Sequence, residues 1–281
     1  LRILDLGNAL IDIDKLGFNK LNLTRFTSMI ERPYGIVLIT GPTGSGKSTT
    51  LYAALNKLND ETVNIITIED PVEFQLEGIN QIQVNHNVGM TFATGLRSIL
   101  RQDPNIIMVG EIRDKETVEV AIRSSLTGHL VLSTLHTNDA LSSITRLVDM
   151  GIEPFLVATS LSGIVAQRLI RKVCRDCAEP QAATKREIEI FAKRGLKIDK
   201  IMRGKGCASC NMTGYRGRIA IHEVIVVNEE MRRTIMNDDS VTHLRQIAMK
   251  NKTIFLLDDG LLKVKQGLTT TEEVLRVAIS E

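Results

Sequence analysis

The sequence predicts an α/β fold with a parallel sheet, followed by a cysteine-bearing insertion and a mainly helical C-terminal region. Three observations predict this class. Residues 41–49 read GPTGSGKST, short apolar runs alternate with helical patterns from 35 to about 150, and all four cysteines stand in two CxxC pairs. Alternation of this kind is typical of parallel strands joined by crossover helices.

Composition sets limits on the class of protein. The chain has 281 residues, 43% hydrophobic and 24% charged, with a formal net charge of +2. This length favours more than one domain, and the small net charge gives no overall basic field for nucleic acid. The apolar stretch at 155–170 is interrupted by polar side chains and predicts no membrane span.

The first elements precede the glycine-rich motif. A strand at 1–4, an Asp-rich turn and a helix over about 24–31, ended by Pro33, are expected there. Because the chain starts at Leu1 inside that strand, we expect a fragment of a longer protein.

Strands and helices then alternate. Strands are expected at 36–40, 64–68, 106–109 and 130–134. The segment TFATGLRSILRQ predicts an amphipathic helix with Phe92, Leu96, Ile99 and Leu100 on one face. Asp114 is an expected N-cap for the next helix, which Gly128 closes.

From about 152 the pattern predicts helix, then the cysteine-bearing insertion, then helices at 229–237, 240–250 and 270–280. The expected units are therefore the end of a truncated N-terminal domain with its linker, a P-loop core, the insertion and a helical region. Their boundaries are 1–34, 35–170, 171–222 and 223–281.

Residues 41–49 form a complete Walker A motif between an apolar strand and a helical segment. In that order the motif is a phosphate cradle, because glycines turn backbone N–H groups inward and the helix N-terminus adds positive potential. We expect Lys47 to reach the β and γ phosphates of a nucleoside triphosphate and Ser48 to bind Mg²⁺. The residues expected to hold the nucleotide are Gly41, Pro42, Thr43, Gly44, Ser45, Gly46, Lys47, Ser48 and Thr49. The alternative, a glycine-rich turn with a chance lysine, fits this context poorly.

Acidic groups and a histidine follow the other predicted strands. Glu69 and Glu73 follow the second strand, Glu111 the third and His136 the fourth. Ligands of parallel sheets bind beyond the carboxyl ends of the strands. These groups beside a phosphate cradle predict a hydrolytic site. In isolation, the segment IEDPVEF would be better interpreted as a solvated acidic turn broken by proline.

Each of these side chains has an expected role. Glu111 closes an apolar strand, where a carboxylate of the Mg²⁺ shell is expected. Glu69 and Glu73 are candidates to orient or deprotonate the attacking water, with Glu69 preferred because it lies closer to the strand end. His136 is expected to sense the γ phosphate.

The other histidines are expected to play lesser parts. Seven residues of strand at about 3.3 Å each separate His129 from His136 by about 23 Å, so both cannot reach one phosphate. His129 is expected to have a structural role, to lie at a subunit interface, or to be an ordinary hydrogen-bonded histidine. His86 is expected to be a loop residue.

The cysteines are Cys174, Cys177, Cys207 and Cys210, with 29 residues between the two pairs. Two CxxC pairs predict a closed tetrahedral Zn²⁺ site that holds structure and performs no chemistry. Disulfides would need an oxidising compartment, which an ATP-using enzyme without a signal peptide does not suggest. Basic residues flank the site and can offset thiolate charge, face an acidic partner or bind nucleic acid; they are Arg171, Lys172, Arg175, Arg216 and Arg218.

Taken together, five ordered motifs resemble the secretion ATPase superfamily, and within it the assembly ATPases of type II secretion and type IV pilus systems. They are GPTGSGKST, TIEDPVEF, RQDPNIIMVGEIRD, TGHLVLSTLHTNDA and the tetracysteine insertion ending in NMTGYRGRIAIHE. The stretch at 145–174 looks closer to the type II secretion branch. Retraction-type relatives lack the insertion, so its presence points to the assembly direction.

The resemblance implies a RecA-like core in a homohexameric cytoplasmic motor that hydrolyses ATP with Mg²⁺. Such a motor lies at the inner membrane through a platform protein and a membrane-anchored partner, and it extends a pseudopilus or a pilus. Nucleic acid is not an expected partner. Arg2 matches a position that brings positive charge to the nucleotide when the preceding domain closes.

Two other functions fit parts of the sequence. A P-loop domain with a zinc-ribbon module could bind nucleic acid, which binding of single-stranded DNA would reveal. A P-loop kinase of small molecules lacks a visible lid for an acceptor and ranks last.

Overall fold

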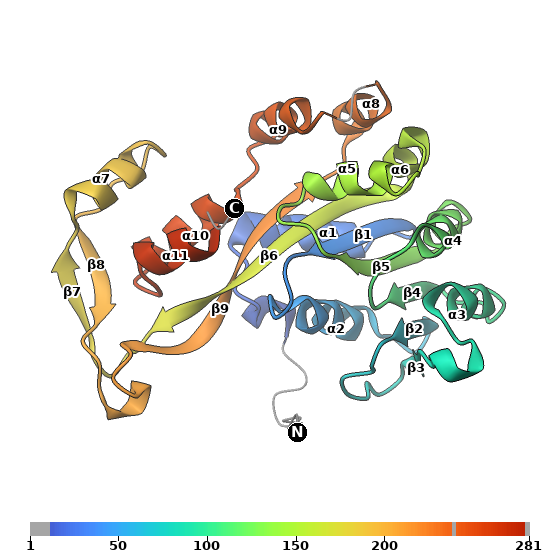
Figure 1. The fold of residues 1–281 in the computed structure, drawn as a ribbon, viewed down its shortest axis with the longest axis horizontal. Helices are drawn as coiled ribbons and strands as arrows, with labels where there is room; N and C mark the ends of the chain where they lie inside the picture. The colour runs from blue at the N-terminus through green and yellow to red at the C-terminus, as the bar shows by residue number, and fades with distance from the viewer. Residues whose placement is uncertain (1–11, 238–239, 279–281) are drawn as a thin grey trace.

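The computed structural model of the chain describes residues 12–237 and 240–278 (Figure 1). The helices are α1 (Lys20–Ile30), α2 (Lys47–Leu58), α3 (Phe92–Ile99), α4 (Lys115–Leu126), α5 (Ser142–Asp149), α6 (Pro154–Ser160), α7 (Lys185–Ala192), α8 (Glu229–Asn237), α9 (Val241–Lys250), α10 (Leu256–Lys265) and α11 (Thr271–Ala278). The strands are β1 (Gly35–Thr40), β2 (Ile65–Glu69), β3 (Asn80–Gln83), β4 (Ile106–Val109), β5 (Leu130–Leu135), β6 (Leu161–Val173), β7 (Ala178–Ala182), β8 (Lys200–Gly204) and β9 (Tyr215–Val226). Short 3-10 helices are η2 (Ile13–Lys15), η3 (His86–Val88) and η4 (Ala208–Cys210).

The main sheet has the strand order β3-β2-β4-β5-β1-β6-β9. All neighbours pair in parallel except β9, which runs antiparallel to β6. The four strands predicted at 36–40, 64–68, 106–109 and 130–134 correspond to β1, β2, β4 and β5 within one residue at either end. Because these four are consecutive in the sheet, their carboxyl ends lie along one edge.

Helices cover both faces of the sheet (Figure 1). Strand β1 is buried throughout, and its alternate residues enter different cores: Ile36 and Leu38 face one, Val37 and Ile39 the other. A strand buried on both faces reads as a continuous apolar run, which explains the sequence of β1. The first core includes α3 and α4, and the second includes α1 and α2.

Helix α1 packs on the sheet rather than standing apart from it. It begins at Lys20, earlier than the predicted 24–31, because the Asn19 side chain accepts the N–H of Asn22 at 2.9 Å and caps the helix. The Asn22 amide donates to the carbonyl of His222 on β9 at 3.0 Å. The predicted strand at 1–4 and Arg2 lie outside the described residues.

The prediction of helix after 152 was correct only as far as Ser160. Strand β6 follows α6 at once and runs for 13 residues. It pairs with β1 on one side and β9 on the other, and this pairing decides between strand and helix for an apolar run that fits both. Strands β3, β7, β8 and β9 were also not predicted.

Most of the predicted helices are present. Asp114 caps α4 by accepting the N–H of Thr117 at 2.8 Å, and α8, α9 and α11 lie where the sequence places them. Helix α10 was not predicted. Across residues 12–237 and 240–278, no helix combines the length and the apolar character needed to cross a bilayer.

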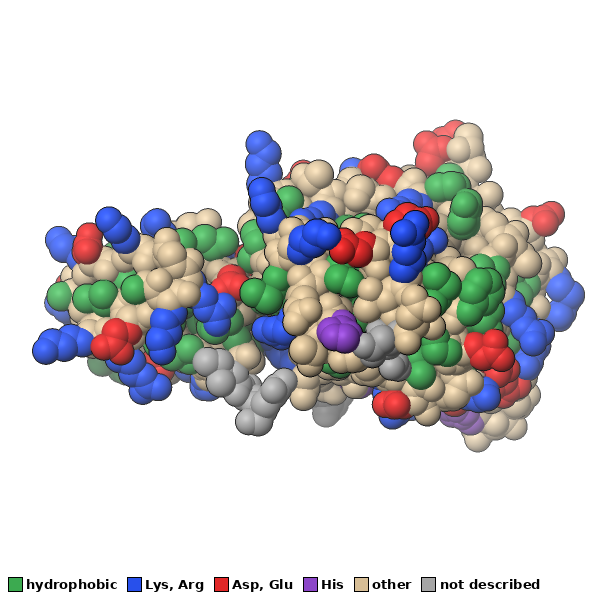
Figure 2. Space-filling view, turned by 90° about the horizontal axis from the view of Figure 1, so that it is seen from above, with side chains coloured by type: hydrophobic (Ala, Val, Ile, Leu, Met, Phe, Trp, Pro, Cys, Tyr) green, Lys and Arg blue, Asp and Glu red, His purple; other side chains and the backbone are tan. Residues whose placement is uncertain are grey.

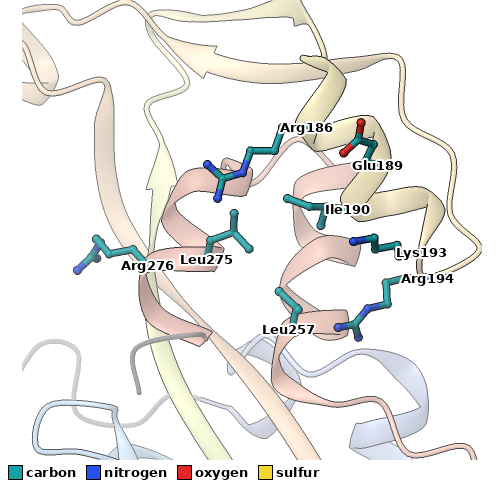
Figure 3. Close-up of a pocket in the computed structure, with 8 residues that line it drawn as sticks. All are labelled: Arg186, Glu189, Ile190, Lys193, Arg194, Leu257, Leu275 and Arg276. Atoms are coloured by element: carbon teal, nitrogen blue, oxygen red, sulfur yellow. The ribbon is translucent and has the colours of Figure 1, made fainter.

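Residues 174–214, here called the arm, lie between β6 and β9 and project from the body (Figure 1). The antiparallel pair β7–β8 and helix α7 form the arm. Lys and Arg side chains stand out over much of its visible surface (Figure 2). Between α7 and helices α10 and α11 lies a cleft of about 670 Å³ (Figure 3), lined by Arg186, Glu189, Ile190, Lys193, Arg194, Leu257, Leu275 and Arg276.

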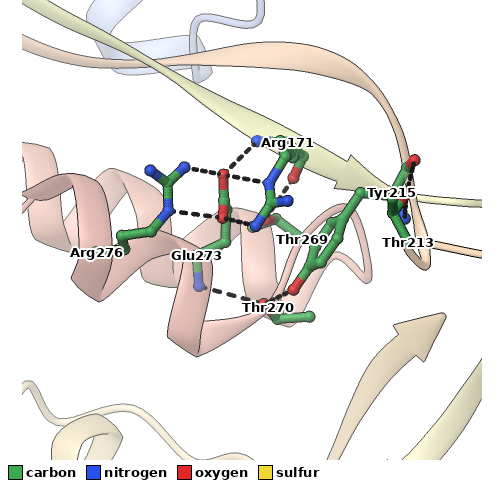
Figure 4. Close-up of polar contacts among 7 residues, drawn as sticks. All are labelled: Arg171, Thr213, Tyr215, Thr269, Thr270, Glu273 and Arg276. Atoms are coloured by element: carbon green, nitrogen blue, oxygen red, sulfur yellow. Dashed lines mark hydrogen bonds and ion pairs between the residues drawn. The ribbon is translucent and has the colours of Figure 1, made fainter. Parts of the chain in front are cut away.

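A buried carboxylate on α11 holds the end of β6, next to the arm (Figure 4). Glu273, with a side chain only 1% exposed, accepts hydrogen bonds from Arg171 on β6 and Arg276 on α11. Arg171 also stacks on the Tyr215 ring, with its Cζ 4.3 Å from the ring centroid. Tyr215 lies 2.8 Å from the Thr270 hydroxyl, so β6, β9 and α11 are joined at one point.

This carboxylate should make stability depend on pH. Burial alone would raise the pKa of Glu273, but the hydrogen bonds from Arg171 and Arg276 outweigh it and lower the pKa to about 2 from 4.5. The stabilisation is therefore complete above about pH 4.5 and is lost as the pH falls toward 2. We expect Glu273→Gln to lower the free energy of unfolding by about 2–3 kcal/mol at neutral pH and by less at about pH 3, in urea titrations. The exposed Glu272→Gln is the control, and an equal loss at both pH values would contradict this account.

Candidate functional site

The P-loop joins β1 to α2 at the edge of the sheet. Gly41, Gly44 and Gly46 have φ values of +147°, +79° and +89°, which side chains disfavour. A Cβ added at Gly41 would lie 2.4 Å from the Gln167 carbonyl oxygen, whereas one at Gly44 would meet nothing within 4 Å. The loop is thus packed on β6 on one side and open on the other, as a phosphate cradle at a helix N-terminus requires.

Lys47 is the first residue of α2. Its ammonium donates to the carbonyls of Gly41 and Pro42 at 2.8 and 3.1 Å, which holds it against the loop. Burial lowers the pKa of Lys47, while the negative charge of Glu111 raises it. Ser48 and Thr49, the next residues, are exposed in the first turn of the helix. These groups fit the nucleotide and the Mg²⁺ expected from the motif.

Glu111 and His136 meet at the ends of β4 and β5. The Thr134 hydroxyl donates to the Gly110 carbonyl at 2.8 Å, which fixes the two strand ends side by side. His136 Nε2 lies 3.2 Å from Glu111 Oε2, and Arg113 binds the other oxygen of the same carboxylate. The Glu111 side chain is 14% exposed and that of His136 48%. A cation and an imidazole therefore share one largely buried carboxylate.

A hydrogen bond also links the end of β1 to the segment that follows His136. The Thr137 N–H donates to the Thr40 hydroxyl at 3.0 Å, so the residue after His136 is fixed to the residue before the P-loop. Adjacent strand ends thus place the P-loop, Glu111 and His136 on the same side of the sheet, and Glu111 lies near enough to Lys47 to raise the pKa of that lysine.

Glu69 is the last residue of β2 and is 4% exposed. Its carboxylate accepts hydrogen bonds from Tyr52, from Thr67 at 2.7 Å and from Gln81 at 3.1 Å. Burial, and then the bond to Glu69, raise the pKa of Tyr52. Glu73 is half-buried, and its N–H donates to the Tyr52 hydroxyl at 3.2 Å. Glu69 is therefore firmly held, and Tyr52 connects both glutamates to α2.

The other histidines lie apart from this group. His129 stands at the amino end of β5, where its Nδ1 lies 2.9 Å from the Ser124 carbonyl oxygen. His86 is exposed in the loop that contains η3. Of the two histidines that flank β5, only His136 lies at the P-loop edge.

Sequence reasoning did not single out several residues of the site. Arg113 binds Glu111, Tyr52 binds Glu69, and Gln167 and Arg168 on β6 contact the P-loop and the segment after His136. Arg113 stands two residues from Glu111 and could have been noticed. Gln167 and Arg168 carried no local signal, because the site residues that they bind, Ser45, Thr50 and Asn138, are 30 or more residues away in the chain.

The four cysteines converge at the base of the arm. Their sulfur atoms all lie within 4.8 Å of one another. Three measured separations are 3.6 Å for Cys207–Cys210, 3.8 Å for Cys174–Cys207 and 3.9 Å for Cys177–Cys210. A tetrahedral ion with metal–sulfur bonds of about 2.3 Å places its ligands about 3.8 Å apart. The cluster can therefore bind a metal ion.

Backbone groups and ion pairs surround this cluster. The N–H groups of Cys207 and Gly214 point at the Cys210 sulfur, at 3.2 and 3.3 Å. Burial opposes ionisation, but these donors lower the pKa of Cys210 to about 6. Among the flanking basic residues, Arg171 pairs with Glu273 and Arg216 with Asp176 at 3.3 Å. Part of the positive charge around the cysteines is thus neutralised by carboxylates of the same chain.

The chain is similar to known proteins along almost its whole length. Residues 1–276 match the family described as type II/IV secretion system protein. Type II secretion system protein E of Pectobacterium carotovorum subsp. carotovorum is 52% identical over 282 residues, which cover 100% of this chain and 56% of that protein. Type II secretion system ATPase E of Vibrio cholerae serotype O1 is 50% identical over 277 residues, 99% of this chain and 55% of that protein. The chain spans about half the length of these relatives.

Solved structures give a similar answer. The crystal structure of the pilus retraction motor PilT with bound ADP has a TM-score of 0.72 and 30% identity, and covers 95% of this chain and 67% of that chain. The ATPase DotB of Legionella pneumophila, 24% identical, shares the fold with a TM-score of 0.71, over 97% of this chain and 66% of that chain. The motif resemblance is thereby confirmed: this chain belongs to the type II/IV secretion system protein family.

Proposed function

We propose that this chain is the Mg²⁺-dependent ATP-hydrolysing part of a motor for type II protein secretion. The observation that carries this proposal is the meeting of Glu111 and His136, 3.2 Å apart, on the strand tips beside the P-loop lysine. The relatives named as type II secretion proteins favour secretion as the pathway. Assembly of a type IV pilus is the alternative.

The residues divide the chemistry among them. Backbone N–H groups of residues 43–48 and the Lys47 ammonium would hold the β and γ phosphates, and the Ser48 hydroxyl with Glu111 would hold Mg²⁺ or its water ligands. His136, bonded to Glu111, would respond to the γ phosphate. Phosphoryl transfer needs a positioned water and compensating charge more than covalent help. Glu69 and Glu73 are the candidates to orient that water, and Arg2 would add charge from the preceding domain.

The metal at the cysteines is proposed to be zinc, with a structural role. Four thiolates close the coordination shell and leave no position for a substrate. Strands β6 and β9 run through the boundaries expected at 170 and 222. We therefore treat the arm, 174–214, as the inserted unit, and propose 1–34 as the end of an N-terminal domain with its linker and 223–281 as the helical region.

Assembly and partners rest on the relatives and are proposals for the whole protein. We propose a homohexamer in the cytoplasm, held at the inner membrane by a platform protein and a membrane-anchored partner. ATP-dependent closure of domains around neighbouring subunits would then drive the platform and extend a pseudopilus.

Replacement of Lys47 tests the proposal. Lys47→Ala should lower Mg²⁺-dependent ATP hydrolysis by about 10³-fold, because no other side chain of the P-loop can carry positive charge to the phosphates. Circular dichroism and metal content should stay as in the wild type. Lys57→Ala, in the last turn of the same helix, is the control. Hydrolysis that survives Lys47→Ala would contradict the proposal.

A further inference from the structure

Strand β6 continues past the end of β1 and forms a wall beside the P-loop. Thr40, the last residue of β1, pairs with Ala166, so the next two residues of β6 lie level with the loop. These are Gln167 and Arg168, which are 2% and 9% exposed. Two large polar side chains buried beside a P-loop need partners, and the structure shows what they bind.

Gln167 uses both halves of its amide. Its Nε2 donates to the Ser45 carbonyl at 2.8 Å, and its Oε1 accepts the Thr50 hydroxyl at 2.7 Å. A Cβ added at Gly46 would lie 2.8 Å from the same Nε2. One side chain therefore bridges the loop and the helix that begins after it, and holds the two together.

Arg168 makes the second connection. Its guanidinium donates to the carbonyl of Asn138, two residues after His136, and to the Gln167 carbonyl at 3.3 Å. Its positive charge lowers the pKa of Lys47, after the larger effect of burial. From β9, Glu223 accepts the N–H of Ala140 at 3.3 Å and so supports the same segment. The segment that carries His136 is thus fixed to the wall of the P-loop.

We infer that Gln167 and Arg168 are positioning residues for nucleotide binding and hydrolysis. Gln167 holds the P-loop in its phosphate-binding conformation, and Arg168 sets the distance between that loop and His136. The inference rests on the proposed ATPase function and adds two residues of β6 to it. Neither residue needs to touch the nucleotide.

Gln167→Glu separates this role from packing, because the two side chains have the same shape. The carboxylate still accepts from Thr50, but it places an acceptor against the Ser45 carbonyl. We expect the affinity for the fluorescent nucleotide mant-ADP to fall about tenfold and KM for ATP to rise to a similar degree. The buried carboxylate should also lower the melting temperature, so Thr50→Val, which adds no charge, is measured beside it. Gln167→Met and Thr50→Val should each weaken mant-ADP binding, and their combination should do no more than Gln167→Met alone.

Arg168 should affect a different parameter. Arg168→Met should lower kcat several-fold while mant-ADP affinity stays close to the wild-type value, since the P-loop itself keeps Gln167. Arg168→Lys should restore part of kcat, because an ammonium can still donate to the Asn138 carbonyl. A kcat for Arg168→Met equal to that of the wild type would overturn the role of Arg168.

Thr269→Val is the matched control for Thr50→Val. Thr269 is also buried and donates to a β6 carbonyl, that of Arg171 at 2.8 Å, but it lies at the other end of the strand. Wild-type hydrolysis that disappears in Lys47→Ala establishes the proposed function first. If mant-ADP then binds Gln167→Glu and Thr50→Val as well as it binds the wild type or Thr269→Val, the inference is overturned while the proposed function stands. Should Gln167→Glu fail to fold, Thr50→Val tests the same bond from the helix.

Discussion

Glu111→Gln should abolish ATP turnover and leave nucleotide binding intact. The amide has the same shape as the carboxylate but carries no charge, so it cannot hold Mg²⁺ or its water ligands as a carboxylate does. It also presents an N–H₂ group toward Arg113 or His136, which bind the two carboxylate oxygens. We expect a fall of about 10²–10³-fold in kcat and a mant-ADP affinity within about threefold of the wild-type value.

Steady-state phosphate release and mant-ADP titration measure the two effects separately. Glu119→Gln, a half-buried position on α4 with an ion pair to Lys115 at 3.8 Å, is the control. Turnover by Glu111→Gln that is close to the wild-type rate would remove Glu111 from the metal shell. Equal loss of binding and turnover would instead assign Glu111 to the nucleotide pocket.

Loss of the cysteine cluster should unfold the arm without destroying the P-loop. Cys177→Ser with Cys210→Ser leaves two thiolates, too few for a closed site, and structural zinc contributes about 10–16 kcal/mol of binding free energy in small domains. The arm has few buried groups of its own besides Phe191 and Ile201, so it cannot replace this contribution. We expect the bound metal to be lost and amide protons of 174–214 to exchange rapidly.

Metal analysis and hydrogen exchange are the measurements, with mant-ADP binding as the readout for the body. Ser209→Ala, which changes an exposed residue between the last two cysteines, should keep the metal. A double cysteine variant that retains full metal content, or an arm that stays protected without it, would contradict a structural site.

The core of the fold could be predicted because its signals are local. Strands β1, β4 and β5 are short apolar runs that end at turns, and the Walker A motif fixes the order of strand, loop and helix. Glu111 and His136 could be placed together because parallel strands expose their carboxyl ends at one edge. This placement also required β4 and β5 to be adjacent in the sheet. Strands that are consecutive in the sequence of such proteins are commonly adjacent in the sheet.

Other parts depended on contacts between distant segments. The run FLVATSLSGIVAQRLI fits a buried helix or a buried strand equally well, and only pairing with β1 and β9 decides the matter. Glu69 was preferred over Glu73 as the residue that orients the attacking water because it lies at a strand end. No spacing in the sequence predicts that Tyr52, Thr67 and Gln81 bind its carboxylate. The bond between Thr50 and Gln167 joins residues 117 positions apart.

Strand β6 has a mechanical consequence. It runs from the wall of the P-loop to Val173, beside the first cysteine, with one irregularity in its pairing to β9 between Arg171 and Val173. At about 3.3 Å per residue, Gln167 and Cys174 are about 23 Å apart along the strand. A tilt of about 5° at the nucleotide end would displace the cysteine end by about 2 Å. If a metal binds the cysteines, it would hold the base of the arm to the far end of this strand, and a small rotation of the strand beside a bound phosphate would become a larger displacement of the arm.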